Sequence, residues 1–108
     1  MESGFGDLGR YAEPSLLILV SLSDGPKHGY AIMDDSETIG ARRIGAGTLY
    51  AALARLERLG MIEPLPADGS RRRPYRLTAV GAATVKAQLE SLRRLADTGL
   101  ERLEEVSS

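Results

Sequence analysis

Three consecutive arginines, Arg71 to Arg73, follow Ser70 at the return of a predicted turn. Neighbouring guanidinium groups repel one another, so a run of them in one turn is best explained by an anionic partner. DNA phosphates or a narrow minor groove would provide that partner. The alternative is a solvated turn whose charges serve solubility. Because the turn follows a helix with two more arginines, we favour the nucleic-acid contact.

Residues 46–59 are predicted to form that helix, and its two faces differ in kind. Leucines recur at steps of four and three along one face, the spacing of a helix that packs on a core. Small residues on the other face would let the helix sit close to a DNA groove, where arginine contacts phosphates or grips guanine. The alternative is an ordinary solvated face. The leucine stripe is Leu49, Leu53, Leu56 and Leu59; the outward residues are Gly47, Thr48, Tyr50, Ala51, Ala54, Arg55 and Arg58.

Lys27, His28 and Arg43 are further candidates for phosphate contacts. Lys27 and His28 come at the start of a predicted helix, and Arg43 lies in the connector before residues 46–59. For His28, capping or packing of that helix is the simpler role. Tyr30, like Tyr50, is predicted to be a core or partly buried residue, with a hydroxyl that reaches the backbone or a phosphate.

The residue inventory excludes most chemistry other than binding. The chain has no cysteine and only one histidine, so disulfides, thiol nucleophiles and metal sites built from several histidines or cysteines are excluded. We find no credible pair of carboxylates, no glycine loop for a phosphate and no activated serine. The sequence therefore predicts no catalytic residue, no metal site and no cofactor, and the protein is not expected to be an enzyme.

Net charge becomes informative when it is divided along the chain. The 108 residues together carry a net charge of −1, which is unlike a typical nucleic-acid binder. Residues 1–41 sum to −5, residues 42–76 to +5 and residues 77–108 to −1. A basic middle segment between acidic ones indicates a polyanion as its partner.

The elements that must position these side chains follow in the order helix, helix, helix, hairpin and long helix. Asp24-Gly25-Pro26 separates the first two helices, Asp68-Gly69 is the hairpin turn and Thr78 caps the last helix. Pro64 and Pro74 would keep both strands at sheet edges, since proline cannot donate to a ladder. The predicted helices are 14–22, 28–37, 46–59 (with Gly60 as its C-terminal cap) and 79–106, and the strands are 61–65 and 73–77.

The last predicted helix is too long to be covered by so small a body. Its 28 residues at ~1.5 Å each would span ~42 Å. Apolar positions alternate at steps of four and three along it, except where Gly99 falls in the seam, as in a coiled coil. This pattern predicts a dimer interface. Its members are Leu89, Leu92, Ala96, Leu103 and Val106.

The ends of the chain complete the organisation. Residues 1–12 hold three glycines among polar residues and are predicted as a flexible N-terminal arm, followed by a domain at 13–78 and the helix at 79–108. No stretch approaches the ~18 apolar residues that span a bilayer, and none has the features of a signal peptide. We therefore expect a cytoplasmic protein without membrane contact.

Four stretches resemble motifs of the PadR family of transcriptional regulators. They occur in that family's order over about residues 14–82, and jointly they are specific. The stretches are Leu17-Ile18-Leu19 followed by Gly25-Pro26-Lys27-His28-Gly29-Tyr30; Gly47-Thr48-Leu49-Tyr50 through Leu56-Glu57; Gly60-Met61-Ile62-Glu63; and Arg72-Arg73-Pro74-Tyr75-Arg76-Leu77-Thr78 through Gly81.

The resemblance implies a mainly α fold with a small β hairpin: a winged helix-turn-helix with a recognition helix at about 46–59, a wing at 61–77 and a long C-terminal dimerisation helix. It implies a homodimer that represses transcription from a palindromic operator, and a contact of Leu16 or Leu19 with the partner's last helix. A C-terminal part made of this one helix resembles the smaller subtype of the family. One departure is Gly45-Ala46, which caps the recognition helix weakly; another is the absence of tryptophan, which argues against an aromatic-drug sandwich between protomers.

The predicted partners are double-stranded DNA and a second copy of the chain. A small-molecule effector of unidentified class is a further candidate partner. The alternative is a winged-helix dimer whose basic wing contacts an acidic protein. For DNA, the chain has no asparagine and its only glutamine, Gln88, lies in the last helix, so the usual bidentate contact to adenine is missing from the recognition helix. Thr48, with Gly47 and Ala51, is predicted to dominate direct readout, and DNA shape sensed by the arginines to provide the rest.

Overall fold

The computed structural model describes residues 14–40, 42–67, 69 and 72–107. The predicted arm at 1–12, Asp68 of the predicted turn and Arg71 of the arginine run lie outside these residues. Residues 14–21 are helical and lead into the 3-10 turn η1 (Leu22–Asp24). The further elements are β1 (Lys27–His28), α2 (Gly29–Gly40), α3 (Ala46–Arg58), β2 (Ile62–Pro64), β3 (Pro74–Leu77) and α4 (Ala79–Ser107).

The three helices before the hairpin pack around one hydrophobic core. The leucine stripe predicted for α3 is confirmed at three of its four positions, which are buried. It is wrong at Leu59, which is 56% exposed because α3 ends at Arg58 and Gly60, with a φ of 75°, turns the chain away as a C-terminal cap. The core consists of Leu17, Ile18, Leu19, Leu22, Ile32, Ile44, Leu49, Ala52, Leu53, Leu56, Ile62 and Val85.

The sheet has three antiparallel strands in the order β1-β3-β2, one more than the predicted hairpin. Lys27 pairs with Tyr75 and His28 with Pro74, so the second helix begins at Gly29 rather than His28. The prediction that both strands lie at edges is wrong for β3, which is central. Pro74 is tolerated there because it is the first residue of the strand and takes part through its carbonyl oxygen, which accepts a hydrogen bond from Leu65 N at 2.8 Å.

The junction between the sheet and α4 is closely packed. Thr78 Oγ1 accepts a hydrogen bond from Gly81 N at 3.0 Å and donates one to Gly60 O at 2.6 Å, which confirms Thr78 as the cap of the last helix. A Cβ atom on Gly81 would lie 2.0 Å from the carbonyl oxygen of Met61, so this first turn of α4 requires glycine. The cap and the close contact together fix the direction in which α4 leaves the body.

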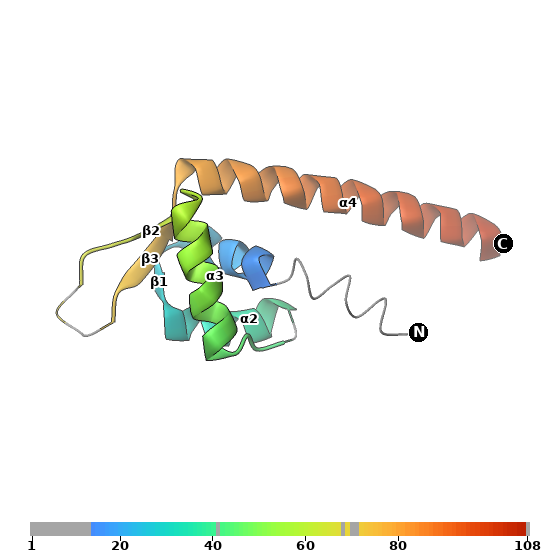
Figure 1. Ribbon diagram of the computed structural model, residues 1–108. Coiled ribbons are helices and arrows are strands. Elements are labelled where there is room, and N and C mark those ends of the chain that lie inside the picture. The colour runs from blue at the N-terminus through green and yellow to red at the C-terminus, as the bar shows by residue number, and fades with distance from the viewer. Residues whose placement is uncertain (1–13, 41, 68, 70–71, 108) are drawn as a thin grey trace.

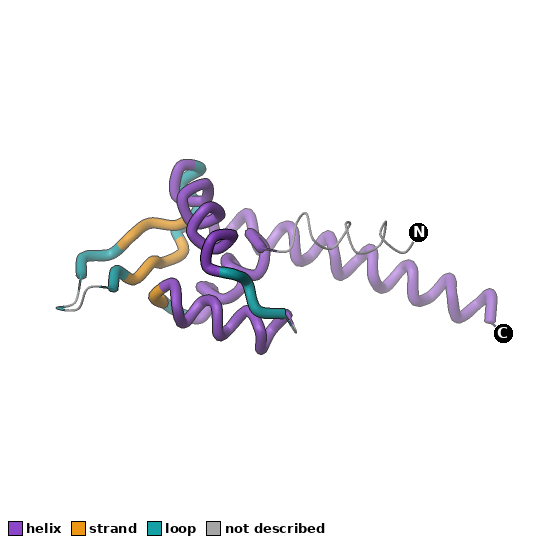
Figure 2. Tube along the Cα trace, turned by 60° about the horizontal axis from the view of Figure 1, so that its bottom comes forward, coloured by secondary structure: helices purple, strands orange, loops and turns teal. Residues whose placement is uncertain are grey.

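Helix α4 has 29 residues, and its C-terminal part extends well beyond the body. Figures 1 and 2 show the free end of α4 and the β2–β3 hairpin at opposite ends of a molecule that measures 59 Å along its longest axis. Val85, near the start of α4, is buried in the core. Among the described residues, no helix combines the length and the apolar character needed to cross a membrane.

Candidate nucleic-acid interface

The outward face of α3 is open to solvent along its whole length. Three small residues and Tyr50 occupy the N-terminal half of this face and two arginines the C-terminal half, because the leucines between them turn into the core. A second helix or a groove could therefore approach the N-terminal half closely. The exposed residues include all six that the sequence predicts as contacts on this helix: Gly47, Thr48, Tyr50, Ala51, Arg55 and Arg58.

The N-terminus of α3 is suited to an anion. Its N-cap, Gly45, has no side chain to satisfy the first backbone amides, and the first helical hydrogen bond runs from Leu49 N to Gly45 O at 2.9 Å. Ile44 fixes this start, since its side chain is buried and its N–H donates to Ser36 Oγ at 3.0 Å. A hollow of about 70 Å³ beside the N-terminus is lined by Pro14, Leu17, Arg42, Arg43, Ile44, Gly45 and Thr48. Unsatisfied amides beside arginines are a favourable setting for a phosphate.

Arg43 reaches back from this connector to α2. It forms an ion pair with Asp34, and its Nη1 lies 3.8 Å from Glu37 Oε1. The hydrogen bond to Asp34 raises the pKa of the Arg43 guanidinium above its ordinary value. Its guanidinium carbon lies 5.5 Å from the centre of the Tyr30 ring. Arg43 is thus exposed near the N-terminus of α3 with two carboxylates beside it, and its contact with a phosphate stays a prediction.

The segment that leads from the tip of the wing into β3 lies beside the same Tyr30 ring. The guanidinium carbon of Arg72 also lies 5.5 Å from the centre of the Tyr30 ring. Arg72 and Arg73 from the wing, Tyr50 from α3, Tyr75 from β3, and Gly29 and Tyr30 from α2 line one hollow of about 290 Å³. Burial raises the pKa of the Tyr75 phenol, and the nearby Glu57 carboxylate adds to that shift. Two predicted arginines and one predicted tyrosine are therefore brought together.

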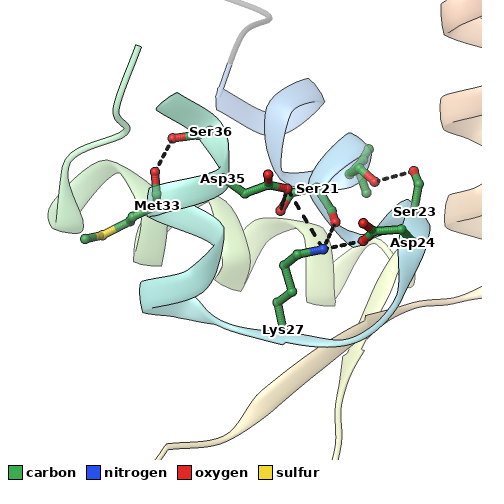
Figure 3. A network of polar contacts seen from close by, with 8 residues as sticks. Ser21, Ser23, Asp24, Lys27, Met33, Asp35 and Ser36 are labelled. Carbon is green, nitrogen blue, oxygen red and sulfur yellow. Dashed lines mark hydrogen bonds and ion pairs between the residues drawn. The ribbon is translucent and has the colours of Figure 1, made fainter. Parts of the chain in front are cut away.

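Lys27, predicted as a phosphate contact, is instead held inside the body (Figure 3). Its ammonium donates hydrogen bonds to Ser21 O and to Asp24 and lies 3.9 Å from Asp35 Oδ2. Ser21 Oγ donates to the same Asp35 oxygen at 2.8 Å, and the Lys27 hydrogen bond lowers the pKa of the Asp24 carboxyl. Lys27 thus ties β1 to the end of the first helix and to α2, and we remove it from the candidate contacts.

His28 and Arg55, two further predicted DNA contacts, also have side chains that partly face other parts of the protein. His28 is a partly buried member of β1 with an enclosed Nδ1, so this edge of its ring faces protein rather than solvent. Arg55 is exposed, and its Nη2 donates to Ser15 Oγ at 2.5 Å, which directs the guanidinium toward the first helix. Arg58, one turn later, is exposed at the end of α3.

Sequence reasoning missed the part played by Tyr30. It predicts a partly buried ring, whereas the ring is 53% exposed and lies beside two arginines from other segments. Those arginines are far from Tyr30 along the chain, so no local pattern could reveal the contact. Arg42, at the start of the basic segment, was likewise missed and lines the hollow at the N-terminus of α3.

The exposed apolar face of α4 lies away from these arginines. Four of its predicted interface leucines and valines are 40% to 84% exposed, and Ala96 is exposed as well. The seam predicted from the spacing omits Leu95 and Leu100, which are also exposed. Leu16 is partly buried, and Leu19 is 3% exposed in the protomer's own core, so Leu19 has no surface to offer a partner. A groove of about 430 Å³ at the base of α4 is lined by Ser23, Leu77, Ala82, Val85, Lys86, Leu89, Glu90 and Arg93.

Comparison with known proteins identifies a family model and several proteins that this chain resembles. The family model described as "Transcriptional regulator PadR-like family" matches residues 18–87. The transcriptional regulator Rv3488 of Mycobacterium tuberculosis is 36% identical over 83 residues, which cover 75% of this chain and 77% of that protein. A structure of a transcriptional regulator from Clostridium thermocellum superposes with a TM-score of 0.74 at 28% identity, over 88% of this chain and 93% of the other.

A second relative is an uncharacterized 37.1 kDa protein in a Streptomyces fradiae transposon, TN4556, with 42% identity over 86 residues. The match covers 80% of this chain but spans only 25% of that protein.

Proposed function

Because the chain belongs to the PadR-like family of transcriptional regulators, we propose that it acts as a homodimeric repressor on a palindromic operator. The observation that carries this proposal is the convergence of three basic elements on one surface. The outward face of α3 borders two hollows, one shared with the connector that holds Arg43 and the other with Arg72 and Arg73 of the wing. Arg43 and Arg72 also lie at the same tyrosine ring, that of Tyr30. Such a surface fits the phosphates on either side of a groove.

In this arrangement α3 enters the major groove with its N-terminal half leading. Thr48 would read base edges through its hydroxyl and methyl, while Gly47 and Ala51 allow the close approach. Arg55 and Arg58, at the far end of the helix, would contact phosphates. Arg72 and Arg73 would contact the backbone or the minor groove beside it, where DNA shape adds to specificity.

The dimer would form through α4. Leucines that are exposed in the protomer cost about 25 cal/mol per Å² of apolar area left in water, so a second copy that covers them stabilises both chains. Two copies related by a dyad would present two α3 helices to half-sites ~34–36 Å apart or a multiple of that distance. Occupation of the operator would exclude other proteins from the promoter, and the site of action would be the cytoplasm.

The salt dependence of binding to duplex DNA tests this proposal. Purified protein is titrated onto a random duplex at several salt concentrations, and the logarithm of affinity should fall steeply with the logarithm of salt. Replacing Arg72 and Arg73 together by Ala should flatten the slope by about 0.9 for each phosphate that the variant no longer neutralises. The matched control removes two arginines from α4, Arg94 and Arg102, and should leave the slope close to that of the wild type.

A flat slope in the wild type would contradict the proposal. Weak, salt-independent DNA binding combined with capture of a strongly acidic protein by the wing would favour the alternative function. Sequencing of duplexes selected from a random pool should return a palindrome, and selection of sites without dyad symmetry would argue against two α3 helices reading one operator.

A further inference from the structure

Tyr30 lies where two separate basic segments of the interface meet. Its ring belongs to the first turn of α2 and is more than half exposed, so it is not a core side chain. Arg43 comes to it from the connector before α3, and Arg72 from the return of the wing. Each guanidinium carbon lies 5.5 Å from the ring centre, within the distance at which a cation and an aromatic face attract each other.

We propose that Tyr30 is a positioning residue of the DNA-binding surface, whose ring holds Arg43 and Arg72 so that both meet the DNA backbone as one unit. This role rests on the proposed DNA-binding function. The ring does not need to touch DNA. It links the wing to the connector that begins the recognition helix.

Two like charges on one ring would ordinarily repel each other. The carboxylates of Asp34 and Glu37 on α2 offset the charge of Arg43, since Asp34 forms an ion pair with it and Glu37 lies 3.8 Å away. Arg72 can therefore share the ring with Arg43 at little electrostatic cost.

The contact of Arg72 with the Tyr30 ring also orders a part of the wing that lies outside the sheet. Arg72 lies two residues before Pro74, where β3 and its pairing with the other strands begin, so the sheet alone does not fix its side chain. A guanidinium already held against an aromatic ring loses less rotamer freedom when it binds a phosphate.

The test compares Tyr30→Leu with Tyr30→Phe in the full chain. Phenylalanine keeps the aromatic face and loses only the hydroxyl, whereas leucine keeps an apolar side chain and loses the ring. Exposed cation–π contacts are each worth about a twofold to fivefold change, so Y30L should bind duplex DNA about fivefold more weakly. Its salt slope should flatten by about 0.9 or more, while Y30F stays within about twofold of the wild type.

A double-mutant cycle with Arg72→Ala separates positioning from general stability. If the ring acts through Arg72, the Y30L substitution should have a much smaller effect in the R72A background than in the wild type. In the free protein, NMR signals of the Arg72 side chain should carry a ring-current shift that Y30L removes and Y30F retains. A general loss of stability would lower the thermal midpoint without producing this coupling.

Three results would overturn the role of Tyr30 while the proposed function stands: wild-type-like binding by Y30L, an equal loss in Y30F and Y30L, or independent effects of Y30L and R72A. Equal losses in both variants would assign the effect to the hydroxyl instead of the ring. A wild-type protein that shows no salt-dependent DNA binding would overturn the proposed function and this role together.

Discussion

Helices α3 and α4 both carry leucines at steps of three and four, yet only α3 covers them within the protomer. Leu49, Leu53 and Leu56 of α3 are at most 2% exposed, whereas Leu100 and Leu103 of α4 are more than 60% exposed. The spacing therefore indicates which face of a helix is to be covered but does not say by what. Length decides the outcome: α3 has 13 residues, all beside the core, whereas α4 has 29 and only its beginning, at Val85, reaches the core.

The polar faces of α3 and α4 differ in charge. The outward face of α3 has arginines and no acid beyond Glu57, and it adjoins the arginines of the connector and the wing. The polar positions of α4 mix acids and bases with little net charge. A polyanion would thus be attracted to the α3 end and not to the α4 end, which fits the proposal that α3 contacts DNA and α4 forms the dimer.

The largest effect is expected when the exposed face of α4 is charged. Changing Leu92 and Leu103 together to Asp should give a monomer, because burying two carboxylates in an apolar interface is strongly unfavourable. Specific DNA affinity should fall about a thousandfold, into the range of non-specific binding, since one protomer reads only half an operator. Sedimentation and duplex titration measure the two effects.

The matched control places the same two charges elsewhere on α4. Ser91 and Thr98 lie outside the leucine face by helical spacing, and their replacement by Asp should leave the dimer intact. If S91D/T98D became monomeric, or if L92D/L103D stayed dimeric, the assignment of the α4 leucines to the dimer would be wrong.

A second prediction compares one leucine from each helix in the monomeric L92D/L103D background. Leu53 is 1% exposed, so Leu53→Ala should lower the free energy of unfolding by about 2–5 kcal/mol through reduced burial and a cavity. Leu100→Ala should change it by less than about 0.5 kcal/mol, because that side chain is exposed in the protomer. Urea unfolding measures both. If Leu53→Ala and Leu100→Ala lowered the free energy of unfolding by similar amounts, the two leucines would not differ in burial within the protomer, and the contrast between α3 and α4 would be wrong.

The smallest effect is expected at Lys27, which belongs to neither binding face. Lys27→Met should lower the free energy of unfolding near neutral pH by about 1–2 kcal/mol, because the hydrogen bond to Ser21 O is removed. The dimer and the salt slope of DNA binding should not change. A flattened salt slope in K27M would show that Lys27 contacts phosphate after all.

The pH dependence of K27M follows from Asp24. Lys27 holds the folded-state pKa of Asp24 below its ordinary value of 3.8, so this pair stabilises the fold above that pH and loses its effect as pH falls through the lower folded-state pKa. The stability difference between wild type and K27M should therefore narrow as pH drops below about 4. A difference that stays constant to pH 2 would mean that Asp24 takes no part.

Much of the fold could be predicted from sequence because its signals are local. The leucine spacing of α3, the glycine at its C-terminal end and the threonine before α4 each depend on neighbours within one turn, and all three are confirmed. The prediction fails at Leu59 because the leucine spacing continues one residue past the end of the helix. It misses the central position of β3 because β1 has only two residues and no alternating pattern.

The candidate site was predicted by residue type but not by geometry. Sequence can show that Lys27, Arg43 and Arg72 are basic, but not that Lys27 turns inward to Asp24 and Asp35 while the arginines share Tyr30. These contacts join residues that are distant along the chain, so they follow from the packing of the body rather than from any motif. In the same way, Leu19 lies on the inward side of its helix, which excludes it from the predicted partner contact and leaves Leu16 as the candidate.

Sedimentation equilibrium of the wild-type chain tests the central claim most directly, namely that the leucines of α4 are covered by a second copy. We expect a single species at micromolar concentration with twice the 11.6 kDa mass of the chain. The same experiment on L92D/L103D should give the mass of one chain, with circular dichroism showing that the helices of the body persist. A wild-type protein that sediments as a folded 11.6 kDa monomer would contradict the claim.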